Sequence, residues 1–436
     1  MQLVAYGAQD VYLTGQPKVT FFQAVYKRHT NFAMENIQQT VNGTPSNSGR
    51  VSVTIARNGD LVGNMYVALQ PTLAASANLT SDNSTADLCW VAERAIASVE
   101  LTIGGQRIDK HYQTWFRLYA EVFLSESDKI NYGKLTTTQL NDTTNKNYVY
   151  LPLLFFFNRN PGLYLPLIAL QYHEVRLDFD LTSTFTNYFG ASSQVFEVWA
   201  NYVYLDTEER RRFAQKGHEY LIEQVQHTGG DSITSASQTV RLSFNHPVKE
   251  LVWCYQNTAS TATNSMWNFS TSCANVHVTA NVAPTTIGSA LPHTIGAPRL
   301  YGAGTLASNI FWIEEGSAVA GAAGKEVGPM KDFKLVLNGQ DRFKEQLGKY
   351  FNQYQPYVYH SGTPYPGIYV YSFALQPEEH QPTGTCIFSR IDNAQVAVWL
   401  KTASATNAAY NLQKMFAVNY NILRIQSGMG GLAFSN

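Results

Sequence analysis

Residues 98–106 read SVELTIGGQ, and residues 332–340 read DFKLVLNGQ. Each segment alternates apolar and polar side chains, the pattern of a strand with one buried face, and each ends in a turn that contains glycine. Two further pairs of segments keep the same order along the chain, residues 175–179 with 396–400 and residues 201–205 with 419–423. A repeat about half as long as the chain indicates two similar domains rather than a solenoid.

An apolar stripe at helical spacing follows each copy of the strand. The stripe comprises Trp115, Leu118, Tyr119 and Val122 in the first half, and Phe343, Leu347, Tyr350, Phe351 and Tyr354 in the second. We therefore expect a buried helix after each copy, with Trp115 and Phe343 in the two cores.

The composition bounds the class of protein. The chain has 436 residues, enough for two or more domains, and 14% of them are charged, against about 25% in typical globular proteins. The surface must therefore be largely uncharged and polar, and we expect much of it to face other subunits. The formal net charge of −1 provides no long-range field for nucleic acid or anionic lipid. We expect no direct contact with nucleic acid.

Short alternating runs occur throughout, for example at residues 51–55, 195–205 and 416–422, and the connections between them differ in length. This pattern favours jelly-roll or other Greek-key sandwiches over a meander. The most apolar stretch, residues 151–170, contains Pro152, Pro161 and Pro166. It is predicted to form two buried strands around an Asn-Pro-Gly turn rather than a membrane span.

Residues 206–214, DTEERRRFA, are the densest charge cluster in the sequence. We interpret them as a short helical or turned linker whose arginines pair with neighbouring carboxylates. Residues 72–87 and 257–328 have the composition of long exposed loops, and the second is expected to contain strands and to project from its sandwich.

The cysteines and the first residues indicate the compartment. Cys89, Cys254, Cys273 and Cys386 lack the paired spacing of a zinc site, so we expect buried, reduced thiols. The first ten residues mix polar and apolar groups, which is not the pattern of a signal peptide. We therefore expect synthesis in a reducing cytosol.

No recognisable catalytic constellation occurs in the sequence. Residues 316–325 have the small residues of a phosphate-binding loop, but Val319 and Glu326 stand where the motif needs Gly and Ser or Thr. The acidic pairs Glu314-Glu315 and Glu378-Glu379 lie in polar stretches typical of solvated loops. We therefore predict a protein without enzymatic activity, metal site or cofactor. Sequons occur at Asn42, Asn78, Asn83, Asn141 and Asn268, but a cytosolic chain would not meet the secretory glycosylation machinery.

Several long segments resemble the major capsid protein of nucleocytoplasmic large DNA viruses, most closely that of algal viruses. They are residues 2–15, 21–22, 26–32, 57–61, 208–213, 218–224 and 428–436. The resemblance covers the whole chain. It implies an all-β fold of two consecutive eight-stranded antiparallel jelly rolls, with short helices in loops. It also implies trimeric capsomers of pseudo-hexagonal outline that build an icosahedral shell over an internal membrane.

The same resemblance divides the chain. It implies an inner-face segment at residues 1–31, a first jelly roll at 32–205, a linker at 206–217 and a second jelly roll at 218–436, whose loop near 257–328 points outward. The inner-face segment would contact minor capsid proteins or the membrane. The protein would be made and assembled in the host cytoplasm and reside in the virion. Relatives carry glycans outside the usual sequon, so Asn257 is a hypothetical glycosylation site.

A carbohydrate-binding double β-sandwich module is the alternative, because jelly rolls also form lectins. The tyrosines and phenylalanines between residues 350 and 371 would then line a sugar site. Such aromatic stretches more often pack loops together or against neighbouring subunits.

Overall fold

The computed structural model describes the chain except residues 1–3, 5–6, 72–89, 137–147, 191–194, 257–327, 363, 365–366, 402–411 and 436. Nearly all of the expected outward loop and Asn257 therefore lie outside the described residues, as do Cys89, Cys273 and the sequons at Asn78, Asn83, Asn141 and Asn268. Asn42 is described and is exposed, in the short strand β2 (Val41–Asn42).

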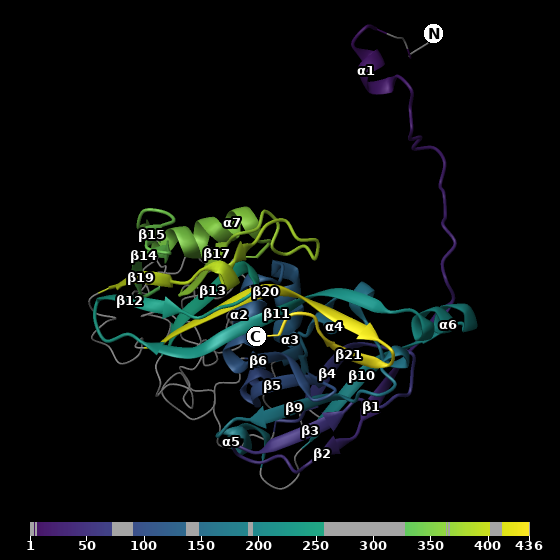
Figure 1. The fold of residues 1–436 in the computed structure, drawn as a ribbon, viewed down its shortest axis with the longest axis horizontal. Helices are drawn as coiled ribbons and strands as arrows, with labels where there is room; N and C mark the ends of the chain where they lie inside the picture. Colours follow the sequence, from purple (N-terminus) through teal and green to yellow (C-terminus); the bar gives the residue numbers. More distant parts are fainter. Residues whose placement is uncertain are drawn as a thin grey trace, which may run out of the picture.

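The first half of the chain forms a sandwich of two antiparallel sheets (Figure 1). One sheet has the order β1-β10-β4-β7 and comprises β1 (Phe32–Gln39), β4 (Leu61–Leu69), β7 (Val149–Pro152) and β10 (Phe196–Leu205), with β8 (Leu165–Pro166) beside β4. The other has the order β2-β3-β9-β5-β6 and adds β3 (Arg50–Thr54), β5 (Ile96–Ile103), β6 (Gln106–Tyr112) and β9 (Val175–Leu181).

The second half repeats this arrangement. One sheet has the order β11-β20-β13-β17 and comprises β11 (His218–Ser232), β13 (Pro247–Gln256), β17 (Ile368–Ser372) and β20 (Leu412–Gln426), with β18 (Cys386–Ile387) and β21 (Met429–Leu432) at its margins. The other has the order β12-β19-β14-β15 and comprises β12 (Ser237–Leu242), β14 (Met330–Leu337), β15 (Gln340–Asp341) and β19 (Ala394–Leu400), with β16 (Gln346–Leu347) beside β14.

The two halves have the same topology, because each strand order of the first sandwich recurs in the second when the strands are matched in chain order. The sequence repeat falls on equivalent strands, β5 and β14, and on the equivalent pair β9 and β19. Both β9 and β19 alternate buried and more exposed positions, as strands with one face in a core do. The predicted fold of two consecutive jelly rolls is confirmed.

Short helices lie between the strands and, in the case of α1, ahead of the first one. They are α1 (Asp10–Thr14), α2 (Gln113–Val122), α3 (Glu126–Thr136), α4 (Phe156–Arg159), α5 (Phe185–Phe189), α6 (Thr207–Gln215), α7 (Gln355–Tyr359), a π-helical turn at Tyr350–Tyr354 and 3-10 turns at Val91–Arg94, Pro161–Leu163, Leu167–Ala169 and Phe388–Arg390. No described helix is long and apolar enough to cross a membrane.

Two sequence predictions about local structure need correction. The helix expected in the second half begins only at Gly348, because residues 346–347 pair with β14 as strand β16 and leave Leu347 61% exposed. The stretch 151–170 is not two strands around one turn. A short helix, α4, interrupts it, because the Asn158 side chain accepts a hydrogen bond from the Phe155 backbone nitrogen and donates one to the carbonyl oxygen of Gly63.

The charge cluster is helix α6, and it is exposed, as predicted for a helical or turned linker. Its N-cap, Asp206, accepts a hydrogen bond from the backbone nitrogen of Glu209 at 2.9 Å. Arg212 pairs with Glu209 at 3.1 Å, and Arg210 reaches back to Asp60 of the first sandwich at 3.1 Å. Arg211 lies 3.8 Å from Glu208, so each of the three arginines pairs with a neighbouring carboxylate, as the sequence predicts.

The described residues form two hydrophobic cores. One lies within the first sandwich and continues onto β11, β13, β17 and β20 of the second. The other lies between the two sheets of the second sandwich. Cys254 is buried in the first of these cores, as expected, whereas Cys386 is only partly buried and packs against the second.

We expect Trp115→Ala to lower the free energy of unfolding by about 3–5 kcal/mol, because it leaves a cavity where a side chain that is 2% exposed now packs. The effect of Phe343→Ala should be smaller, since Phe343 is only partly buried. Urea unfolding of both variants measures the difference. The control is Tyr172→Ala, at a residue that is 76% exposed, and equal midpoints for Trp115→Ala and this control would contradict the packing.

Candidate assembly surfaces

The sheet β11-β20-β13-β17 is buried on both faces. On β13, Leu251, Trp253 and Tyr255 point into the second core, while Val252 and Cys254, between them in sequence, belong to the core of the first sandwich. Every residue from Val248 to Gln256 is buried. The two jelly rolls therefore meet through the outer face of this sheet, and residues 251–255 of β13 form a continuous apolar run rather than an alternating one.

Aromatic rings from helix α2 and strand β6 cover that outer face. The Trp115 ring lies 5.6 Å from the ring of Phe416 on β20, centroid to centroid. Phe416 stacks on His227 of β11 at 4.2 Å, and Tyr112 meets His227 edge-on at 5.1 Å. Desolvation by burial lowers the pKa of His227, which therefore favours its neutral form. The contact is an apolar interface inside one chain.

Ion pairs flank the apolar contact. Glu223 on β11 is buried and accepts hydrogen bonds from Lys249 of β13 at 2.6 Å and from Arg159 of α4 at 3.5 Å. The Arg159 guanidinium also lies 5.5 Å from the centre of the Tyr119 ring. Because burial of an unpaired charge is costly, these partners fix how the first jelly roll sits on the second.

A histidine clamp, formed by His360 and two carboxylates of the second sandwich, also lies at the junction. His360 contacts Glu250 of β13 through Nε2 and Glu378 through Nδ1, the latter at 3.2 Å, and its ring meets Phe123 of the first sandwich at 5.2 Å. Burial alone would lower the pKa of His360, but the charges and hydrogen bonds of the two carboxylates raise it to about 9. The imidazolium is thus held between two carboxylates.

Residues 428–432, near the end of the chain, are also hydrogen-bonded to the first sandwich. The backbone nitrogen of Leu432 donates to the Gln106 side-chain oxygen at 3.1 Å, and the nitrogen of Tyr172 donates to the carbonyl oxygen of Gly428 at 2.9 Å. A side chain at Gly430 would approach Leu170 to 2.7 Å, so the Leu170 side chain would have to shift.

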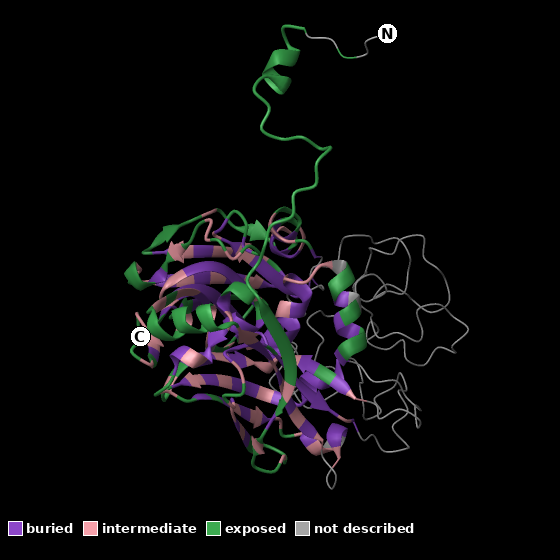
Figure 2. Ribbon diagram, turned by 90° about the vertical axis from the view of Figure 1, so that its right-hand side faces the viewer, coloured by how far each residue is buried: buried purple, intermediate pink, exposed green. Residues whose placement is uncertain are grey.

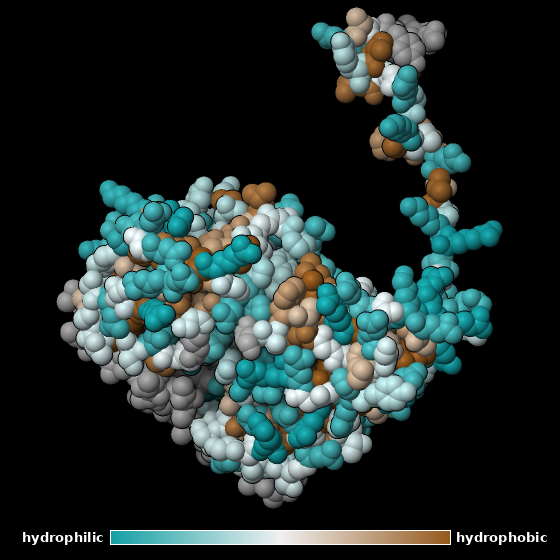
Figure 3. All heavy atoms as spheres, viewed as in Figure 1, coloured by the Kyte–Doolittle hydropathy of each residue, from teal (hydrophilic) through white to brown (hydrophobic). Residues whose placement is uncertain are grey.

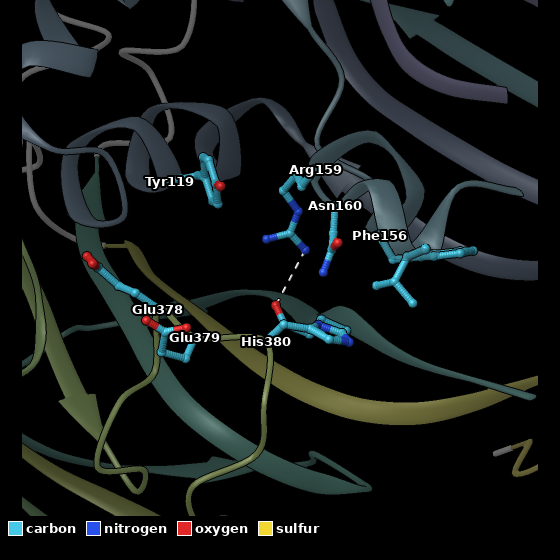
Figure 4. Close-up of a pocket in the computed structure, with 9 residues that line it drawn as sticks. Tyr119, Phe156, Arg159, Asn160, Glu378, Glu379 and His380 are labelled. Carbon is cyan, nitrogen blue, oxygen red and sulfur yellow. Dashed lines mark hydrogen bonds and ion pairs between the residues drawn. The ribbon is translucent and has the colours of Figure 1, made fainter. Parts of the chain in front are cut away.

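A cavity of about 340 Å³ lies at the junction of the sandwiches (Figure 4). Tyr119 and Arg159 approach it from the first sandwich, and Glu378, Glu379 and His380 approach it from the opposite side. The carboxylate of Glu378 is hydrogen-bonded to His360 and to the backbone of Ser361. The cavity lining mixes acidic, basic and aromatic groups, and its pair Arg159–Glu223 joins the two sandwiches.

The N-terminal arm, residues 10–31, extends away from the body of the molecule (Figures 1 and 2). All of its residues are exposed. Its large apolar side chains are spaced along it (Figure 3), and those more than half exposed are Val11, Tyr12, Leu13, Val19, Phe21, Phe22, Val25 and Tyr26. Exposed apolar side chains in such number make the arm a candidate contact surface.

The candidate sites from the sequence are dispersed. Within the tyrosine-rich stretch, Phe351 and Tyr369 are buried in the second core while Tyr354 and Tyr357 are exposed, so the described aromatic residues do not line one sugar site. Among the described residues no group of three or more metal-ligating side chains is arranged to hold a metal ion. The histidine clamp was missed, because 110 residues separate His360 from Glu250 and no local motif joins them.

A buried ionic cluster lies under α2 in the first sandwich. Arg117 pairs with Glu93 at 3.5 Å and with Glu121 at 3.2 Å, and its guanidinium lies 3.7 Å from the centre of the Trp90 ring. Burial raises the pKa of Glu93 to about 7, although Arg117 and Tyr132 oppose the shift. The cluster anchors α2 to the turn at Val91–Arg94.

Comparison with known proteins identifies the class. A family model described as large eukaryotic DNA virus major capsid protein matches residues 209–431, and a model of the major capsid protein N-terminus matches residues 20–206. The major capsid protein of Paramecium bursaria Chlorella virus 1 is 44% identical over 467 residues, covering 100% of this chain and 99% of that protein. Capsid protein 1 of Acanthamoeba polyphaga mimivirus is 31% identical, with the same coverage.

Comparison with solved structures also finds viral capsid proteins. A quasi-atomic model of the PBCV-1 virus capsid superposes with a TM-score of 0.75 at 38% identity, covering 96% of this chain and 100% of that one. The Faustovirus major capsid protein, at 13% identity and a TM-score of 0.66, shares the fold and covers 97% of this chain and 94% of its own.

Fold and matches together define a viral capsid protein with a double jelly roll. The chain belongs to the family of large eukaryotic DNA virus major capsid proteins. The family predicted from the sequence is confirmed, and the carbohydrate-binding alternative is not supported.

The histidine clamp makes stability depend on pH. Because the folded-state pKa of His360 lies above the ordinary 6.5, its proton stabilises the fold fully below pH 6.5, and this stabilisation is lost as the pH rises through about 9. We expect the urea midpoint to fall over this range in the parent chain. His360→Gln should reduce that fall, whereas His29→Gln, at an exposed position, should keep it. A parent midpoint that does not change over this range would contradict the clamp.

Proposed function

We propose that this chain forms trimeric capsomers of pseudo-hexagonal outline, which build an icosahedral shell over an internal membrane. One observation carries the proposal: the chain holds two sandwiches of the same topology, joined by a buried sheet. Three copies around an axis then present six similar units, so a closed symmetric trimer can occupy a hexagonal position. The boundaries we propose are residues 32–205 and 218–436 for the jelly rolls and 206–217 for the linker.

The N-terminal arm belongs to the proposed inner-face segment, residues 1–31. It combines exposed apolar side chains such as Phe21 and Phe22 with Lys18, Lys27 and Arg28, a combination that suits an acidic membrane surface or minor capsid proteins. In this proposal the protein resides in the virion, assembles in the host cytoplasm, acts without catalysis or cofactor and does not contact nucleic acid directly. Asn257 stays a proposed glycosylation site.

Sedimentation of the purified chain over a concentration series tests the capsomer. We expect a stable species of three times the 48.6 kDa chain mass, because a capsomer needs large lateral interfaces. A chain that stays monomeric at every concentration, also when capsid partners are added, would contradict the proposal.

Flotation with vesicles of acidic phospholipid tests the membrane contact of the arm. We expect the parent trimer to float and the double variant Phe21→Ser, Phe22→Ser to float several-fold less. Burial of the two phenylalanine side chains in the lipid surface contributes about 3 kcal/mol or more of binding free energy, which the variant loses. The matched control is Tyr172→Ser, another exposed aromatic residue, which should float like the parent. Equal flotation of parent and double variant, or none by the parent, would contradict a membrane role and leave minor capsid proteins as the arm's partner.

A further inference from the structure

The outer faces of two repeat-equivalent sheets differ: one is covered by the other jelly roll and one is exposed. In the second sandwich, the face of β11-β20-β13-β17 that points away from its own core is covered by α2 and β6 of the first sandwich. The equivalent sheet of the first sandwich is β1-β10-β4-β7. Its outer face is exposed: Phe32 and Met34 are 51% and 52% exposed, and Tyr150 is 37% exposed.

The chemistry of that outer face is typical of an interface. Trp199 on β10 is paired in register with Gln38 on β1 and with Tyr66 on β4. Tyr66 accepts a hydrogen bond from Asn36 at 2.9 Å and meets Tyr150 edge-on at 5.4 Å. The Glu197 carboxylate accepts a hydrogen bond from the Trp199 indole nitrogen at 3.1 Å. Aromatic residues are enriched, and charges depleted, at the centres of protein interfaces.

The other sheet of the same sandwich shows the contrast. The outer face of β3-β9-β5-β6 carries charges, including Arg50 paired with Asp180 at 2.8 Å and Arg176 paired with Asp178 at 3.0 Å. A surface covered with ion pairs of this kind is typical of a face in contact with water. One face of the first jelly roll is thus suited to solvent and the other to protein.

The matching surface lies on the second jelly roll. The helical segment at Tyr350–Tyr359 follows β15 and β16, as α2 follows β6, so it is the repeat equivalent of α2. Its inner residue Phe351 is buried in the second core, but Tyr354, Tyr357 and Val358 are 54%, 84% and 47% exposed. Figure 1 shows α7 on the side of the molecule opposite to β1 and β10. One copy therefore cannot join the two surfaces.

We propose that the helical segment Tyr350–Tyr359 of one copy packs on the outer face of β1-β10-β4-β7 of the next copy, repeating between copies the contact that α2 makes within the chain. This inference rests on the proposed trimer and names its interface. The contact is head-to-tail. If neighbouring jelly rolls are related by a rotation of about 60°, both within a chain and between copies, three copies close into a ring. No helical surface and no sheet surface is then left uncovered.

Two variants test the interface in the full chain. Tyr357→Asp places a charge on the helical surface, and Tyr150→Asp places one on the sheet surface. We expect the mass of each to fall to one third, to a monomer, while Tyr172→Asp, at an exposed tyrosine outside both surfaces, stays trimeric. Circular dichroism and urea midpoints check that each variant is folded. If Tyr150→Asp does not fold, Met34→Asp replaces it, because Met34 is 52% exposed.

Mixing gives the sharper readout. Tyr357→Asp keeps an intact sheet surface and Tyr150→Asp keeps an intact helical surface, so an equal mixture should form dimers and no trimers, because the ring cannot close. Folded single variants that stay trimeric, or a mixture that stays monomeric, would overturn the inference while leaving the trimer itself in place. A parent chain that is monomeric would overturn the proposed function as well.

Discussion

The sheet β11-β20-β13-β17 is buried on both faces, and the rest of the molecule depends on that burial. Alternate residues of β13 enter two different cores, Trp253 the second and Val252 the first. A separation of the jelly rolls would expose one whole face of this sheet to water, which costs about 25 cal/mol for every Å² of apolar surface. Domains joined by a small polar contact move freely, whereas a large apolar contact of this kind makes one body.

Polar groups at the junction give the apolar contact its orientation. A hydrophobic face alone would tolerate sliding, but the buried carboxylate of Glu223 on the second jelly roll needs Arg159 of the first close by, and the ring of His360 packs against Phe123 of the first. Buried ion pairs add little net stability, yet they strongly disfavour arrangements that leave one partner alone. For a shell protein this matters, because a lattice repeats any error in the angle between its units. The low charge elsewhere leaves aromatic and amide surfaces for neighbouring molecules.

Much of the fold could be predicted from the sequence, because the repeat and the two-residue period are local signals. The strands at residues 98–103 and 332–337 and the helix through Trp115 are where the pattern placed them. The helix in the second half was overextended, since strand pairing of Leu347 with Asp332 is not visible in helical spacing. The junction itself was missed. Its contacts join residues far apart in sequence, such as Thr114 and Lys414, and no local pattern encodes them.

Hydrogen exchange of the purified protein in rising urea tests the central claim most directly. If the doubly buried sheet joins the jelly rolls into one body, the amides of α2, β13 and β20 lose protection together, with the same free energy of opening. The account is contradicted if α2 and the first sandwich exchange at low urea while β13 and β20 stay protected, because the second jelly roll would then be stable without the first.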